Sequence, residues 1–147
     1  PFAIRAEIKD DKYELIVPKV RFAVVDKTEI LNPEQSEEIL FVYSDYEDNT
    51  SIQLTLLIVN SLDDVSGNEF LDKFSGWAEK RLVIKLILST KEVMLFGTEP
   101  LNNSLEKISK NYQTIFEPYL AKGNIYEAAL KGSLEIIKIL SPEYNVP

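Results

Sequence analysis

Short apolar runs alternate along the chain with polar segments that have helical spacing. Residues 20–25, 52–59 and 82–88 are rich in β-branched residues and leucine, which is typical of buried strands. Residues 93–96 form a fourth run, joined to the third by a short polar link, and this predicts a hairpin. Residues 2–17 show period-2 alternation around a polar turn, so we expect a second hairpin at the amino-terminal end.

A clear helix start follows the first buried strand. Asn32 can cap this helix, Pro33 suits its first position and Gln35 can complete a capping box. The helical spacing then places four apolar residues on one face. They are Ile39, Val42, Tyr43 and Tyr46.

A second helix is expected after the 52–59 strand. It begins at Ser66 or Asn68 and spaces three aromatic residues as i, i+4 and i+7. This spacing lines up Phe70, Phe74 and Trp77 on one helical face, so we expect all three in the core.

Two further helices are predicted near the carboxyl end. Ser104 can cap the first, and Pro118 is expected to kink or interrupt it because proline lacks an N–H group. Gly123 is expected as its C-cap, and Asn124 with Glu127 forms a capping box for the last helix. The buried side of that helix carries Tyr126, Leu130, Ile137 and Leu140.

This order of elements predicts a single α/β domain. We expect a mixed sheet of about four strands with helices on both faces, a Rossmann-like αβα sandwich with an N-terminal hairpin extension. The expected boundaries are residues 1–19 for the extension, 20–141 for the domain, and 142–147 for a tail or the start of a linker. A chain of 147 residues can bury roughly 70% of its unfolded surface, enough to fold without a disulfide or a metal.

Composition excludes several kinds of chemistry. The chain has no cysteine and no histidine, which excludes zinc ribbons, thiol catalysis and the usual general base. A metal here would be a hard cation on oxygen ligands. The net charge of −8 argues against nucleic acid or an anionic membrane surface as the main partner. No apolar run is long enough to span a membrane.

Four motifs, in order, resemble the TPM-domain family. The family opening "V-x-D-x-a-x-x-L-s/n-x-E" is similar to residues 24–34, and its second-strand motif is similar to residues 50–62. Its helix that ends in an aromatic residue and a tryptophan resembles residues 70–77. The last motif, "P-x-x-x-x-g-d/n-y-x-x-a-l-x-x-g", is matched by Pro118, Gly123, Asn124, Tyr126, Ala129, Leu130 and Gly132.

The chain also departs from the family pattern in two loops. The family commonly has a glycine-rich, acidic loop after the tryptophan, whereas here Trp77 leads almost directly into the next strand. Of the family's "G-x-G-x-E" turn, Gly97 and Glu99 remain, followed by Pro100. These departures remove acidic side chains that could serve as ligands.

The resemblance implies a site at the strand ends. In the family, acidic residues there are associated with divalent metals, and some plant members are described as acid phosphatases. The corresponding metal ligands here would be Asp26, Asp63, Asp64 and Glu99, with Ca²⁺ as the expected ion and Asp26 also the catalytic candidate. Lys80 and Arg81 could contact an anion. Each of these residues also has a plain structural interpretation, as a loop or helix-end charge.

Three functions remain open. The first is a non-catalytic interaction or assembly module with a protein partner in a membrane-associated complex. This function is favoured because acidic residues of the two family loops are missing here. The second is a metal-dependent phosphatase, and the third is a calcium-binding domain without catalysis. The family includes thylakoid-lumen proteins linked to photosystem repair and bacterial extracytoplasmic domains. We therefore expect an extracytoplasmic location, in a processed or excised part of a longer, membrane-anchored protein.

Overall fold

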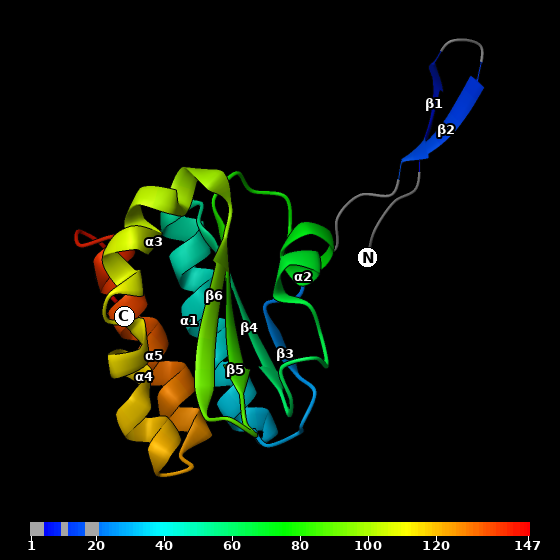
Figure 1. The fold of residues 1–147 in the computed structure, drawn as a ribbon. Coiled ribbons are helices and arrows are strands. Elements are labelled where there is room, and N and C mark those ends of the chain that lie inside the picture. The colour runs from blue at the N-terminus through cyan, green and yellow to red at the C-terminus, as the bar shows by residue number, and fades with distance from the viewer. Residues whose placement is uncertain (1–4, 10–11, 17–20) are drawn as a thin grey trace.

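The computed structural model describes residues 5–9, 12–16 and 21–147, and its centre is a four-stranded mixed sheet (Figure 1). The strand order is β3-β4-β5-β6, with β3, β4 and β5 parallel and β6 antiparallel to β5. The strands are β3 (Val24–Asp26), β4 (Gln53–Val59), β5 (Arg81–Ile87) and β6 (Glu92–Gly97). The predicted single α/β domain with a mixed four-stranded sheet is confirmed.

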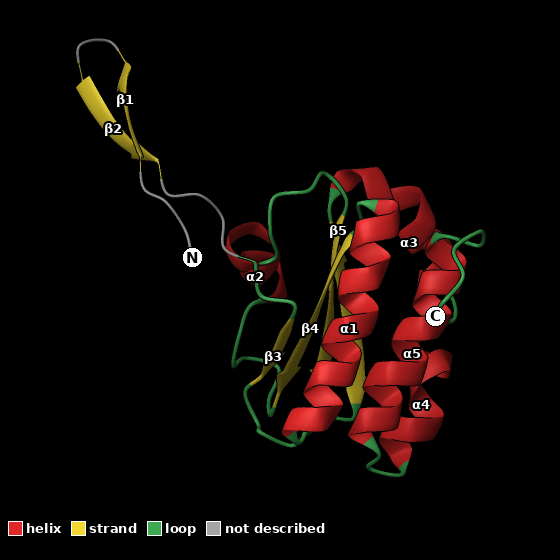
Figure 2. Cartoon of the chain, turned by 180° about the vertical axis from the view of Figure 1, so that it is seen from behind, coloured by secondary structure: helices red, strands yellow, loops and turns green. Residues whose placement is uncertain are grey.

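Helices cover the two faces of this sheet unequally. Figure 2 looks onto α1, α4 and α5, which with α3 cover one face, while α2 packs against β5 and β6 on the other. Their bounds are α1 (Pro33–Thr50), α2 (Gly67–Phe74), α3 (Asn102–Ser109), α4 (Tyr112–Ala121) and α5 (Ile125–Leu140), with a 3₁₀ turn, η1 (Glu99–Leu101), before α3. No helix in the described ranges is long and apolar enough to cross a membrane.

Helix capping follows the sequence closely. The Asn32 side chain accepts from the Gln35 backbone N–H at 2.8 Å, and the Gln35 side chain accepts from the Asn32 backbone N–H, which completes the predicted capping box. Gly123 has a positive φ of 73° between α4 and α5. Asn124 caps α5 by accepting from the Glu127 backbone N–H at 3.2 Å. These caps fix where the helices begin relative to the sheet.

The core has two parts because β4 and β5 are buried on both faces. The larger part joins Leu56, Ile84 and their neighbours to α1, α4 and α5, and the predicted apolar face of α1 is fully included. The smaller part joins Leu57 and Val83 to Phe70 of α2. Burial of this apolar surface is the main driving force for folding.

The expectation that three aromatic residues of the second helix enter the core is correct for Phe70 alone. Phe70 is buried, but Phe74 is 37% exposed and Trp77 is 68% exposed. The reason is that α2 ends at Phe74, and Gly76 adopts a φ of 111° that turns the chain. Trp77 therefore lies in a loop and not on the helical face that its spacing indicated.

The expected break at Pro118 is also wrong. The chain is interrupted earlier, at residues 110–111 between α3 and α4, and Pro118 lies inside α4. The helix that was expected to begin at Ser104 is thus two helices. The interruption lies here because Asn111, whose C=O accepts from the Ile115 N–H at 3.0 Å, starts a new helix.

The amino-terminal hairpin is described by its two strands alone. Strands β1 (Arg5–Lys9) and β2 (Lys12–Ile16) pair in antiparallel register, as the alternation predicts. The other residues of the expected hairpin, 2–4, 10–11 and 17, lie outside the described residues. In the next predicted strand, 20–25, the structure assigns the strand to Val24–Asp26.

Candidate functional site

The carboxyl ends of β3, β4 and β5 meet at one edge of the sheet because these strands are parallel. Asp26 is the last residue of β3, while Asp63 and Asp64 lie in the loop between β4 and α2. The structure therefore places three of the four predicted ligands at the expected edge. We call this the carboxyl edge.

Asp26 closes the loop between β3 and α1. Its Oδ1 accepts from the backbone N–H and the hydroxyl of Thr28, at 3.0 and 2.6 Å, and its Oδ2 accepts from the Leu31 N–H at 2.9 Å. Both carboxylate oxygens thus hold the turn that leads into the capped start of α1. This is the structural role that a loop aspartate is expected to have.

Asp64 acts in the same way in the loop after β4. Its Oδ2 accepts from the backbone N–H groups of Ser61 and Asn60, at 3.0 and 3.2 Å, and its Oδ1 accepts from the Ser61 hydroxyl at 2.8 Å. These bonds, those from Ser61 first, lower the pKa of the Asp64 carboxyl. Asp64 is therefore charged, and its charge is engaged by its own loop.

A buried lysine lies beneath the same loop. Lys85, in the middle of β5, is 2% exposed, and its ammonium group donates to the backbone carbonyls of Leu62 at 2.8 Å and Val65 at 2.5 Å. Burial lowers the pKa of Lys85, and the negative charges of Asp63 and Asp64 partly offset this effect. The loop that carries two predicted ligands therefore already packs against a positive charge.

The other predicted site residues lie at the opposite edge of the sheet. Glu99 follows β6, which runs antiparallel to β5, so it lies beyond Gly97, the residue that pairs with Leu82 at the start of β5. Arg81 begins β5, and it is buried, with its Nη1 donating to the carbonyls of Leu71 and Gly76 at 2.9 and 3.1 Å. The expected grouping of Glu99, Lys80 and Arg81 with Asp26 is therefore wrong.

The arrangement of these carboxylates decides what they can bind. Among the described residues, no group of three or more acidic side chains is placed to hold a metal ion. Calcium takes six to eight oxygen ligands, and Asp26 and Asp64 already accept hydrogen bonds on all of their oxygens. The residues present do not fit a calcium site in this geometry, and the binding of Ca²⁺ by this chain stays a prediction.

A cluster of polar side chains lies at the edge of the sheet opposite the carboxyl edge. Arg21 donates to the Leu54 carbonyl at 2.6 Å and to the Thr55 hydroxyl at 2.8 Å, and it pairs with Glu47 at 3.2 Å. The side-chain oxygen of Gln53 accepts from the backbone N–H of Trp77 at 3.0 Å. Trp77 is thus held through its backbone, with its indole ring left in solvent.

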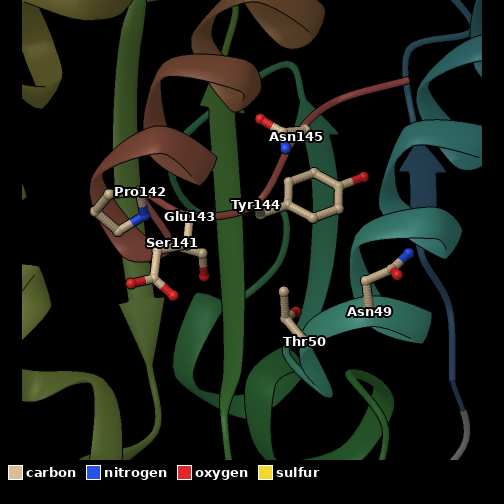
Figure 3. Close-up of a pocket in the computed structure, with 7 residues that line it drawn as sticks. All are labelled: Asn49, Thr50, Ser141, Pro142, Glu143, Tyr144 and Asn145. Carbon is tan, nitrogen blue, oxygen red and sulfur yellow. The ribbon is translucent and has the colours of Figure 1, made fainter.

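Two hollows were not indicated by the sequence. One, of about 680 Å³, lies between the end of α1 and the C-terminal tail, where Thr50, Ser141 and Tyr144 line it (Figure 3). The ring of Tyr144 packs edge-on against Tyr46, 5.1 Å between centroids, and its hydroxyl donates to Asp45. Residues 142–147 were expected to be a tail or the start of a linker, and no periodicity could have revealed this packing.

The second hollow is a groove of about 570 Å³ between β3 and α1. Phe22, Val24 and Leu40 supply apolar surface, and Asp26 and Glu37 supply acidic groups. Leu40 is 42% exposed on a helix whose predicted face is buried elsewhere. An exposed leucine on the polar side of α1 is the one feature of the sequence that could have pointed here.

Comparison with known proteins agrees with this fold. The N-terminal domain of a protein from P. gingivalis superposes with a TM-score of 0.67 at 18% identity, over 81% of this chain and 82% of that domain. The BA42 protein of the psychrophilic bacterium Bizionia argentinensis superposes with a TM-score of 0.63 at 14% identity, over 83% and 89%. A search of curated proteins finds no match.

The sequence profile of the TPM domain matches residues 24–139. This range agrees with the four motifs, which span β3 to α5 in the order that the family requires. The match covers most of the 147 residues, so the chain belongs to the TPM-domain family.

Proposed function

We propose that this chain is a protein-interaction module of the TPM family rather than a phosphatase. The observation that supports this most directly is the use of Asp26 and Asp64 to close their own loops. A phosphoester-cleaving site needs groups that stabilise charge on the transferring phosphoryl group. The four candidate carboxylates are divided between two edges of the sheet, and two of them, Asp26 and Asp64, accept from backbone N–H groups of their own loops.

We further propose that the module acts outside the cytoplasm, tethered to a membrane, in the maintenance or repair of a membrane protein complex. This part rests on the family alone, whose members include extracytoplasmic domains. The net charge of −8 favours a protein partner over nucleic acid or an anionic lipid surface. Exposed apolar side chains such as Phe22 and Leu40 provide surface on which a partner could pack.

The first test separates this proposal from calcium binding and catalysis. Thermal melts with and without millimolar CaCl₂ are compared for the wild type, Asp26→Asn and, as a matched control on the exposed side of α1, Asp48→Asn. A ligand that binds only the native state must raise the melting temperature. We expect the same small effect of calcium on all three proteins, together with no hydrolysis of p-nitrophenyl phosphate beyond the buffer rate.

A calcium-dependent rise that Asp26→Asn abolishes and Asp48→Asn retains would establish a metal site instead. Hydrolysis that disappears in Asp26→Asn would establish the phosphatase. The interaction itself is tested by purifying the affinity-tagged full-length protein from solubilised membranes of its host. Recovery with a defined membrane protein complex supports the proposal, and recovery of the chain alone, in the non-membrane fraction, contradicts it.

A further inference from the structure

The two edge strands of the sheet, β3 and β6, have no neighbouring strand on their outer sides in the described part of the chain. The order β3-β4-β5-β6 places β3 at the end of the sheet, paired with β4 on one side. At the far end, β6 packs against α2, α3 and α4, and the Gln113 side chain of α4 accepts from the Val93 N–H of β6 at 3.4 Å. The outer side of β3 is therefore the place where the sheet could accept another strand.

The hydrogen bonds between β3 and β4 show which way the backbone groups of β3 point. The Ala23 carbonyl accepts from the Leu56 N–H at 2.8 Å, and the Lys27 N–H donates to the Ile58 carbonyl at 2.9 Å. Along a strand, the N–H and C=O of one residue point to the same side, and the sides alternate. Val24 and Asp26 therefore direct their backbone groups away from β4, towards the outer side, where the Asp26 carbonyl also accepts from the Glu29 N–H at 3.5 Å.

A groove runs along this same outer side. Its floor is apolar, formed by Phe22, Ala23 and Val24 of the chain leading into β3, and its other wall is a stripe of α1 that includes Leu40. Phe22 is 46% exposed and packs against Phe74, 6.0 Å between ring centroids. An extended segment lying here could pair with the backbone of β3 and place apolar side chains against Leu40.

The charge of the groove selects among possible occupants. Asp26, Glu37 and Glu47 line it, and its one cation, Arg21, is paired with Glu47 at 3.2 Å. A second copy of this chain would bring the same acidic groups face to face, which disfavours self-pairing. A segment with lysine or arginine side chains would meet the negative charges of Asp26 and Glu37, for which the residues that line the groove supply no second cation.

We propose that β3 and the groove beside α1 bind an extended, basic segment of a partner protein, which adds to the sheet as a fifth strand. The backbone of β3 supplies hydrogen bonds, and the apolar floor and acidic rim select alternating apolar and basic side chains. This inference rests on the proposed interaction function and names the surface and the partner chemistry that carry it.

The test uses synthetic peptides. A fluorescein-labelled, end-capped peptide of alternating valine and lysine is titrated with the full chain at low salt, and fluorescence anisotropy measures its affinity. A matched peptide has glutamate in place of lysine. We expect binding of the lysine peptide that weakens as salt is added, because salt screens the charges, and no binding of the glutamate peptide.

Two variants on α1 locate the site. Leu40→Lys should weaken binding of the lysine peptide by about tenfold or more, since it places a like charge in the groove. Phe41→Lys introduces the same charge at an exposed neighbour that does not line the groove, and it should change the affinity much less. Both positions are at the surface of α1, so the circular dichroism spectrum should be unchanged in each variant.

Backbone pairing is tested on the peptide. Two further peptides are N-methylated at every second amide, one at the odd and one at the even positions, so that each has one hydrogen-bonding edge blocked and the other free. One of the two methylated peptides should fail to bind, and the other should bind. Equal binding of the two methylated peptides, equal effects of the two lysine variants, or no binding to the wild type would each overturn this inference. None of these results would affect co-purification with a membrane complex, which tests the proposed function separately.

Discussion

Lys85 lies in the middle of β5, all seven residues of which are buried. A charged group in such a position is costly unless it is hydrogen-bonded, and here its ammonium donates to the Leu62 and Val65 carbonyls. The sequence shows the lysine plainly, as a break in the apolar run of residues 82–88. Its partners could not be predicted, because they are backbone carbonyls of a distant loop.

A pH dependence follows from the burial of Lys85. Burial lowers the pKa of Lys85 in the folded chain, whereas an unfolded lysine has a pKa of about 10.4. Between the two values the unfolded chain holds more protons, so this group makes the free energy of unfolding rise with pH. We expect the stability of the wild type relative to Lys85→Met to increase as the pH rises through the lowered pKa of Lys85 towards about 10, measured by urea denaturation.

Lys131 provides a control of opposite sign. The hydrogen bond to Glu127 raises the pKa of Lys131. Any stability that this pair contributes is therefore lost as the pH rises through the raised pKa of Lys131. The stability of the wild type relative to Lys131→Met should stay constant or fall over the same range. Equal pH profiles for the two differences would contradict the account of Lys85.

The contact between α4 and α5 depends on a glycine. A Cβ atom at Gly132 would come within 2.1 Å of the ring of Phe116, which is fully buried. In an exposed helix, glycine to alanine gains about 1 kcal/mol, but overpacking a core typically costs about 1–3 kcal/mol. Because Phe116 is fully buried, we expect the steric cost to dominate.

We therefore expect Gly132→Ala to lower the free energy of unfolding by about 1–2 kcal/mol, measured by urea denaturation. Combining it with Phe116→Leu should recover part of the loss that the two single changes together produce, since the smaller side chain makes room. If the two losses simply add, the contact between α4 and α5 is not the cause.

The helices and strands could be predicted where residues close in sequence determine their position. The apolar run of residues 52–59 and the capping box at Asn32 gave β4 and the start of α1 within a residue or two. The position of Trp77 was not predictable, because the end of α2 is set by the turn at Gly76 and not by the aromatic spacing. Pro118 shows the same limit, since packing of α4 against α5 tolerates it inside a helix.

The grouping of site residues depends on the whole molecule. Asp26 and Glu99 both follow strands, and the sequence cannot show which strand is reversed; the antiparallel direction of β6 places them at opposite edges. The groove beside β3 likewise requires the strand order, which decides that β3 is at an edge. The candidate site was therefore only half predictable, although the fold class was correct.

The domain boundary gives a prediction for the whole chain. Arg21 anchors the start of the domain through Leu54, Thr55 and Glu47, and the Phe22 N–H donates to the Phe74 carbonyl at 2.9 Å. A chain that begins at residue 21 should melt at the temperature of the full chain. A chain that begins at residue 24 should lose roughly 1–3 kcal/mol of stability, because it leaves the Leu54 carbonyl without the Arg21 donor and removes the cation that pairs with Glu47.

Differential scanning calorimetry of the three chains checks this boundary. If removal of residues 1–20 lowers the melting temperature as much as removal of residues 1–23, the expected boundary near residue 20 is wrong and the extension is part of the folded unit.

The exposure of Trp77 also decides how this protein can be observed. It is the only tryptophan in the chain, and its indole ring is in solvent in the native state. The wavelength of its emission maximum therefore shifts little when the chain unfolds. Tyr43 and Tyr46 are fully buried, so near-ultraviolet circular dichroism from these rings, and not tryptophan emission, is the optical signal that follows the loss of tertiary structure.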